Sequence, residues 1–113
     1  MSNMATSNLT LEMPVSGAGY CKFPDGTLIC HAVLYSMTND DPVTFPATFY
    51  AVPTVLATVT ETTTGNVYEV RAYNRTTSGF TARMARVTSS GPEVVPSITK
   101  VTMAYIAIGR WKA

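Results

Sequence analysis

Side chains branched at Cβ dominate this sequence and restrict what it can fold into. The chain of 113 residues contains 18 Thr, 12 Val and 4 Ile but only 5 Leu. Such side chains lose χ1 freedom in a helix, whereas they fit well on a pleated sheet. Seven Gly and seven Pro are spread along the chain, where they mark turns. The composition therefore favours an all-β domain over a helical bundle or a fold of alternating strands and helices.

Charged residues are scarce. They make up 13% of the chain, and the net charge is +1, whereas about a quarter of the residues of an ordinary domain are charged. Low charge argues against a disordered tail, and the near balance of signs argues against binding to the phosphate backbone of a nucleic acid. A small domain with so little charge tends to hide surface in an oligomer or to present it to a partner.

The first 16 residues show no sustained hydrophobic period and are interpreted as a lead-in or a fragment of something longer, with the domain spanning 17–113. The N-terminus lacks the basic segment and apolar run of a signal peptide, so we expect synthesis in the cytosol. The longest uncharged stretch, residues 42–60, contains three Pro and much Thr, which argues against a membrane helix.

Period-2 patterns predict a small antiparallel β-sandwich of about six strands. The strongest local signal is a β-hairpin whose turn is Pro24-Asp25-Gly26. The strands are expected at 20–23, 27–37, 50–61, 66–75, 80–87 and 101–111, with loops or turns at 38–46, 62–65, 76–79 and 89–96. The strands 27–37 and 101–111 are apolar on both faces, which requires cover from a second layer or a neighbouring subunit.

The two cysteines flank the hairpin turn, so the register of the hairpin tests whether they form a disulfide. A two-residue turn pairs positions whose numbers sum to 51 and places Cys21 opposite Cys30. A three-residue turn pairs positions that sum to 50 and puts the two cysteines on opposite faces. The three-residue turn is favoured because the shorter one needs an N–H from Pro24, which has none. We therefore expect no disulfide.

The residues offer little support for catalysis. His31 is the only histidine, and beside Cys30 it could activate a thiolate, but no third member of such a set is identifiable. Asp40 and Asp41 could ligate calcium, although adjacent acids in a loop are usually solvated turn residues. The chain contains no phosphate-binding glycine loop and no nucleophile elbow. We expect a protein that is not an enzyme and that needs no metal or other cofactor.

A polar, aromatic and cationic group is expected on the outward face of two adjacent strands. Amides and guanidinium groups hydrogen-bond sugar hydroxyls, and aromatic rings stack on sugar C–H surfaces. The alternative is an ordinary solvated sheet face with one cross-strand ion pair, and the residues alone favour that alternative. The candidate ligand-binding residues are Glu69, Arg71, Tyr73, Asn74, Arg75 and Arg83.

Five short motifs occur in a characteristic order along the chain. They are Gly19-Tyr20-x-Lys22-Phe23-Pro24-Asp25-Gly26, Val43-Thr44-Phe45-Pro46-Ala47-x-Phe49, Pro53-x-Val55, Thr77-Ser78-Gly79-Phe80 and Tyr105-Ile106-Ala107-Ile108-Gly109. Their order and spacing over residues 17–111 resemble the C-terminal domain of bacteriophage tail fibre proteins, the gp53-like family, whose architecture is related to that of H-type lectins.

The resemblance implies a homotrimeric β-sandwich at the distal tip of a tail fibre in the virion, with residues 1–16 a remnant of the fibre shaft. It implies attachment to a bacterial surface receptor, a glycan or lipopolysaccharide, and assigns no binding residue. The partners would be two further copies, the rest of the fibre and the glycan, with neither nucleic acid nor membrane insertion. The interface residues expected from the strands apolar on both faces are Val33, Tyr35, Met37, Met103, Tyr105 and Trp111.

Two other functions remain open from the sequence. One is a structural trimerisation cap that has no ligand of its own, and the other is a free-standing, non-viral lectin similar to the H-type lectins. A cap needs only the apolar axis, whereas a receptor-binding domain also needs an exposed polar and aromatic patch. Adsorption of the isolated domain to cells or their extracted glycans distinguishes these functions.

Overall fold

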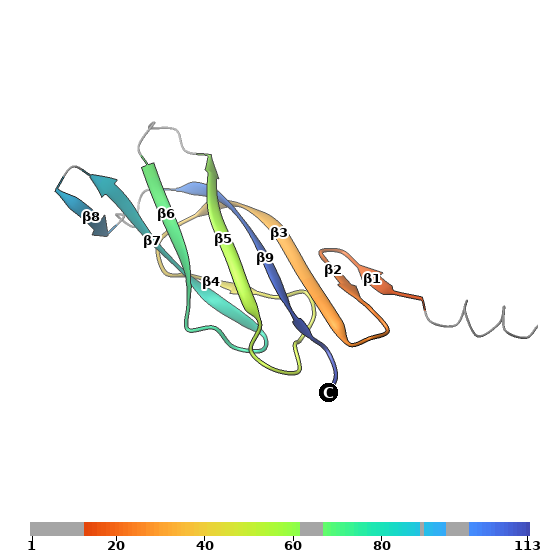
Figure 1. Ribbon diagram of the computed structural model, residues 1–113. Helices are drawn as coiled ribbons and strands as arrows, with labels where there is room; N and C mark the ends of the chain where they lie inside the picture. The colour runs from red at the N-terminus through yellow and green to blue at the C-terminus, as the bar shows by residue number, and fades with distance from the viewer. Residues whose placement is uncertain (1–12, 62–66, 89, 95–99) are drawn as a thin grey trace, which may run out of the picture.

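The computed structural model describes residues 13–61, 67–88, 90–94 and 100–113 (Figure 1). These ranges form nine strands and contain no helix, and so none that could cross a membrane. The strands are β1 (Val15–Gly17), β2 (Tyr20–Lys22), β3 (Thr27–Met37), β4 (Asp41–Thr44), β5 (Thr54–Glu61), β6 (Val67–Tyr73), β7 (Gly79–Thr88), β8 (Gly91–Val94) and β9 (Val101–Arg110).

The strands form two antiparallel sheets. The larger sheet has the order β1-β2-β3-β9-β5, and the smaller one has the order β4-β7-β6. The short strand β8 also pairs with β7, beyond the stretch of β7 that pairs with β4. Figure 1 shows β8 at the end of the molecule away from β1 and β2. The prediction of an all-β antiparallel sandwich is confirmed.

The structure has three short strands more than the six expected. β1 lies partly in the predicted lead-in, so that Val15 and Ser16 pair with β2. β4 and β8 lie in the predicted loops 38–46 and 89–96. Strands of three or four residues are too short to show a period, and Pro42 and Pro92 within them argue for loops. Residues 1–12 of the lead-in and the predicted turn at 62–65 lie outside the described residues.

The hydrophobic core lies between the two sheets. Its buried side chains alternate along β3, β7 and β9, which confirms the inward positions predicted for Phe80, Ala82 and Met84. Four aromatic rings, those of Phe45, Phe49, Phe80 and Tyr105, pack with centroids 5.2–5.8 Å apart. The buried apolar side chains are Leu28, Cys30, Val43, Phe45, Phe49, Phe80, Ala82, Met84, Val101, Met103, Tyr105 and Ala107.

The hairpin of β2 and β3 has the three-residue turn. Cys21 pairs with Ile29 and Tyr20 with Cys30, so both pairs sum to 50, and the two cysteines are free. Gly26 has φ 101°, a left-handed conformation that glycine adopts without strain. The end of β9 holds this turn, because Trp111 Nε1 donates to the carbonyl of Phe23 at 2.8 Å. The predicted register is confirmed.

A bulge near the end of β3 changes which way its last residue faces. The register with β9 shifts between Leu34 and Met37, and Ser36 has φ 55°. The extra residue moves Met37 to the inner face, where it packs against the core. Strict alternation along residues 27–37 places Met37 on the same face as Val33 and Tyr35, with which it was expected at an interface, and the bulge makes that placement wrong.

Burial of Tyr105 predicts a loss of stability in alkali. Burial, with a smaller effect from Cys30, raises the pKa of Tyr105 from 10.0 to about 12. The folded state therefore holds the phenolic proton more tightly than the unfolded state, so the free energy of unfolding falls as the pH rises from about 10 to 12. Urea unfolding at pH 9, 10 and 11 should show a smaller fall for Tyr105→Phe than for the wild type. Equal falls would contradict this assignment.

Candidate functional site

The outer faces of the two sheets point in opposite directions and differ in chemistry. The first, which we call the polar face, is formed by Asp40 and by outward side chains at one end of the β6 and β7 pair, whereas the exposed Val67 and Val87 lie at the other end. The second, which we call the apolar face, is formed by the outward side chains of β3, β5 and β9. The polar face consists of Asp40, Glu69, Arg71, Tyr73 and Arg83, and the apolar face of Ile29, Val33, Tyr35, Leu56, Ala104, Ile106 and Ile108.

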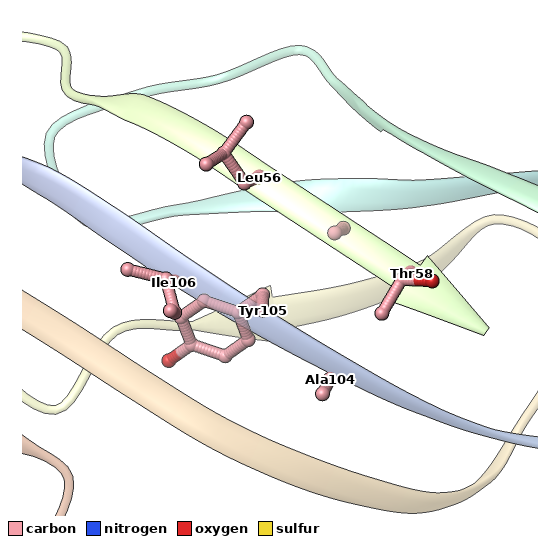
Figure 2. A pocket seen from close by; sticks show the side chains of 6 residues that line it. Leu56, Thr58, Ala104, Tyr105 and Ile106 are labelled. Atoms are coloured by element: carbon pink, nitrogen blue, oxygen red, sulfur yellow. The ribbon is translucent and has the colours of Figure 1, made fainter. Parts of the chain in front are cut away.

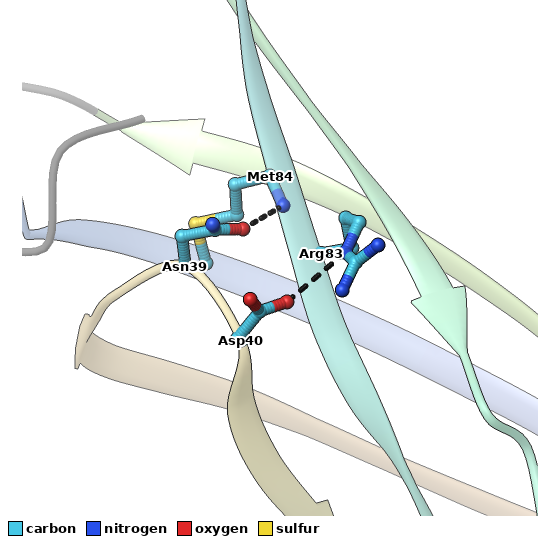
Figure 3. Close-up of polar contacts among 4 residues, drawn as sticks. All are labelled: Asn39, Asp40, Arg83 and Met84. Atoms are coloured by element: carbon cyan, nitrogen blue, oxygen red, sulfur yellow. Dashed lines mark hydrogen bonds and ion pairs between the residues drawn. The ribbon is translucent and has the colours of Figure 1, made fainter. Parts of the chain in front are cut away.

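On the polar face, the antiparallel pairing of β6 with β7 places Arg71 directly opposite Arg83. The guanidinium carbon of Arg83 lies 4.0 Å from the centre of the Tyr73 ring, a cation–π contact. Arg83 Nε also donates to Asp40 Oδ1 at 3.0 Å (Figure 3). Both partners of this ion pair are about half exposed, so we expect it to contribute little to stability. Its effect is to hold the Arg83 side chain in one place.

The loop between β3 and β4 fixes Asp40 beside β7. Asn39 Oδ1 accepts a hydrogen bond from the backbone N–H of Met84 at 2.7 Å (Figure 3). The backbone N–H of Asp40 donates to the carbonyl of Ala82 at 2.7 Å, and Asp40 adopts φ 67°. The loop thus fills the place of an edge strand on β7 between β4 and β8. The sequence predicts a solvated turn residue at Asp40, because a pairing with Arg83, 43 positions away, leaves no local signal.

Two predicted ligand-binding residues lie apart from the polar face. Arg75 Nη1 donates to the carbonyl of Pro53 at 2.7 Å, so Arg75 ties the turn after β6 to the segment before β5. Asn74 is an exposed turn residue with φ 53°. The structure therefore brings together Glu69, Arg71, Tyr73 and Arg83, and assigns Arg75 a structural contact.

The apolar face is built in rows across three strands. Ile106 of β9 lies between His31 of β3 and Leu56 of β5, and Ile108 lies between Ile29 and Thr54. Large apolar side chains remain exposed there, among them Tyr35 at 73% and Leu56 at 65%. An exposed apolar patch of this kind marks an interaction surface.

An open groove of about 210 Å³ runs along the apolar face between β5 and β9. Leu56 and Thr58 line it from β5, and Ala104 and Ile106 line it from β9 (Figure 2). Pockets that hold small ligands usually have volumes of about 300–1,000 Å³. This groove is smaller, and its lining is almost entirely apolar, so it fits a side chain of a packed neighbour better than a free ligand.

Of the six residues predicted for a subunit interface, only two lie on the apolar face. Val33 and Tyr35 lie on the apolar face as expected, but Met103 and Tyr105 are buried in the core, at 0% and 3% exposed. The side chain of Trp111 also packs against the core. The physical reason is the strand period: in β9 the odd-numbered side chains point inward, and Ile106 and Ile108 point outward. The sequence already predicts the outward side chains of β9, among them Ile106 and Ile108, as the second apolar face of residues 101–111.

Cys30 and His31 cannot act as a pair, because their side chains point to opposite faces of β3. Cys30 is buried, and burial raises the pKa of its thiol, which opposes formation of a thiolate. Asp41 Oδ2 accepts a hydrogen bond from the N–H of Thr38 at 2.9 Å, as a turn residue does. Among the described residues, no three His, Cys, Asp or Glu side chains converge on a point that could hold a metal ion.

Comparison of this chain with models of known protein families identifies its family. The model for the C-terminal domain of putative gp53-like tail fibre proteins matches residues 22–110. The chain belongs to this family. The match covers both faces described above and confirms the resemblance in the sequence.

Solved structures show the same fold in other tail fibres. An N-truncated R2-type pyocin tail fibre superimposes with a TM-score of 0.62 at 16% identity, covering 97% of this chain and 44% of that one. An N-truncated R1-type pyocin tail fibre gives a TM-score of 0.59 at 13% identity, covering 96% of this chain and 98% of that one. The tail fibre domain thus spans less than half of the R2-type structure. No curated protein was found to be similar in sequence.

Proposed function

We propose that this domain forms the distal, receptor-binding end of a tail fibre in the virion and attaches the particle to a glycan or lipopolysaccharide on the bacterial surface. The observation that carries the proposal is the opposition of the two faces within a tail fibre fold. The apolar face suits contact with further copies of the chain. The polar face then remains in solvent, where a receptor can reach it.

The apolar face supports a homotrimer. Its exposed large side chains come from three adjacent strands, and its outward positions carry no acidic side chain among the described residues of β3 and β9. Packing of this face around a threefold axis would remove the patch from water, which stabilises the assembly by about 25 cal/mol per Å² of apolar area. The remainder of the fibre would precede β1.

The polar face supports binding of a glycan without catalysis. Arg71 and Glu69 are exposed and supply hydrogen-bond donors and acceptors of the kind that sugar hydroxyls use. The Tyr73 ring is 41% exposed and adds an aromatic edge and a hydroxyl group. The ion pair of Asp40 with Arg83 holds the Arg83 guanidinium on this face, where it can also hydrogen-bond a glycan.

Adsorption of the purified domain to host bacteria tests this proposal. The wild type should bind the cells, and a variant with alanine at Arg71, Tyr73 and Arg83 together should lose most of that binding while remaining folded and trimeric. A trimer that binds none of the strains to which the whole particle attaches would contradict a receptor-binding role. That outcome would instead indicate a trimerisation cap.

A further inference from the structure

The pairing of Arg71 with Arg83 is the least expected feature of the polar face. Side chains that lie directly opposite on an antiparallel pair have Cβ atoms about 4.5–5.5 Å apart, and like charges in such positions repel each other. The register of β6 and β7 makes this proximity unavoidable, because Ala72 pairs with Ala82 and Val70 with Met84 on either side. Negative charge beside two arginines held opposite each other would stabilise the sheet.

The described residues supply only part of that negative charge. Asp40 forms an ion pair with Arg83 through Nε, and the two terminal nitrogens of Arg83 donate no hydrogen bond to any described residue. Arg71 forms no hydrogen bond or ion pair with the described residues. Glu69 lies on the same face of β6, but two residues before Arg71, a spacing of about 7 Å. The donors of Arg71 and the outer donors of Arg83 therefore remain available.

Tyr73 restrains one of the two arginines, Arg83. One face of its ring is covered by the Arg83 guanidinium at 4.0 Å, so this face cannot stack on a sugar. The guanidinium of Arg83 is restrained in two directions: Asp40 binds its Nε, and the Tyr73 ring packs against the plane of the group. A restrained guanidinium beside a free one is suited to an oxyanion, since the planar group donates two parallel hydrogen bonds to a carboxylate or phosphate.

We propose that Arg71 and Arg83 together bind an anionic group, a phosphate or a carboxylate, on the receptor polysaccharide. The inference rests on the proposed function, and it names the chemical class of receptor that the polar face accepts. The ligand would lie over the Arg71 and Tyr73 end of the face, away from the carboxylate of Glu69. A neutral glycan would leave the repulsion between the arginines unrelieved.

NMR titration of the arginine Nε–H resonances tests this proposal with three probes: inorganic phosphate, glucuronate and glucose. Phosphate, glucuronate or both should shift the resonances of Arg71 and Arg83, and glucose should not. Arg71→Gln should weaken the binding of the active probe at least about tenfold, which corresponds to about 1.4 kcal/mol. Lys100→Gln, which removes the same charge from an exposed site at the start of β9, should bind as the wild type does.

The response to phosphate alone would indicate a phosphorylated glycan, and the response to glucuronate alone a uronic acid. Equal shifts with glucose, or equal weakening by Lys100→Gln and Arg71→Gln, would overturn the proposal. Thermal unfolding gives a second readout: Arg71→Thr should raise the melting temperature because it removes the repulsion, whereas a residue with a structural role would lower it.

Cell adsorption separates this inference from the function on which it rests. If the wild type adsorbs to host bacteria and Arg71→Gln adsorbs equally well, the anionic site is wrong and the receptor-binding function stands. If the wild type does not adsorb at all, the proposed function fails, whatever the result of the titration.

Discussion

Replacement of Ile106 by glutamate is expected to convert the assembled domain into folded monomers. Ile106 is 45% exposed in the single chain and lies in the middle row of the apolar face, between His31 and Leu56. In a homotrimer formed through this face, the carboxylate would lose its hydration beside the side chains of His31 and Leu56, which costs about 3–5 kcal/mol for each subunit. Sedimentation velocity at micromolar concentration should show a trimer for the wild type and a monomer for Ile106→Glu.

The matched control places the same charge on the opposite side of the molecule. Thr44→Glu introduces a carboxylate at an exposed position of β4, on the smaller sheet. It should leave the trimer intact, because that side faces solvent in the proposed assembly. If the wild type sediments as a monomer, or if both variants dissociate equally, the assignment of the apolar face to a subunit interface is wrong.

Replacement of Phe80 by alanine is expected to lower the free energy of unfolding by about 3–5 kcal/mol. Phe80 is 4% exposed, and its ring packs on those of Phe45 and Tyr105 at 5.8 and 5.4 Å between centroids. These rings join the two sheets, so the cavity would lie where neither sheet can move in to fill it. Since domains of this kind are stable by about 5–15 kcal/mol, the loss is a large part of the total. Urea denaturation measures it directly.

Tyr105→Phe serves as the control for this prediction. It keeps the ring that packs on Phe80 and removes only a hydroxyl group, so at pH 7 its free energy of unfolding should lie within about 1 kcal/mol of the wild type. A loss as large as that of Phe80→Ala would mean that the hydroxyl group, rather than ring packing, stabilises the junction between the sheets.

Local chemistry explains which parts of the fold could be predicted. The hairpin register follows from Pro24, which lacks an N–H, and from Gly26, which accepts a positive φ. The faces of β6 and β7 follow from strict alternation, so the cluster of Glu69, Arg71 and Tyr73 was predictable from the sequence.

Contacts between distant segments explain what could not be predicted. The ion pair of Asp40 with Arg83 and the hydrogen bond of Arg75 to Pro53 join loops and strands far apart in the chain. The bulge at Ser36, which moves Met37 to the core, carries no glycine or other signal in the sequence. When a strand is apolar on both faces, its sequence does not indicate which face packs on the core. For this reason the sequence predicts Met103 at an interface, although it is buried in the core.

We propose that this tail fibre domain recognises a bacterial surface glycan through its polar face. The most direct measurement is binding of the purified wild-type domain to polysaccharide and lipopolysaccharide extracted from a strain to which the particle attaches, by biolayer interferometry. We expect saturable binding that soluble polysaccharide competes away and that is lost when Arg71, Tyr73 and Arg83 are all replaced by alanine. Saturable binding that survives this triple replacement, or no binding to any extract, would contradict it.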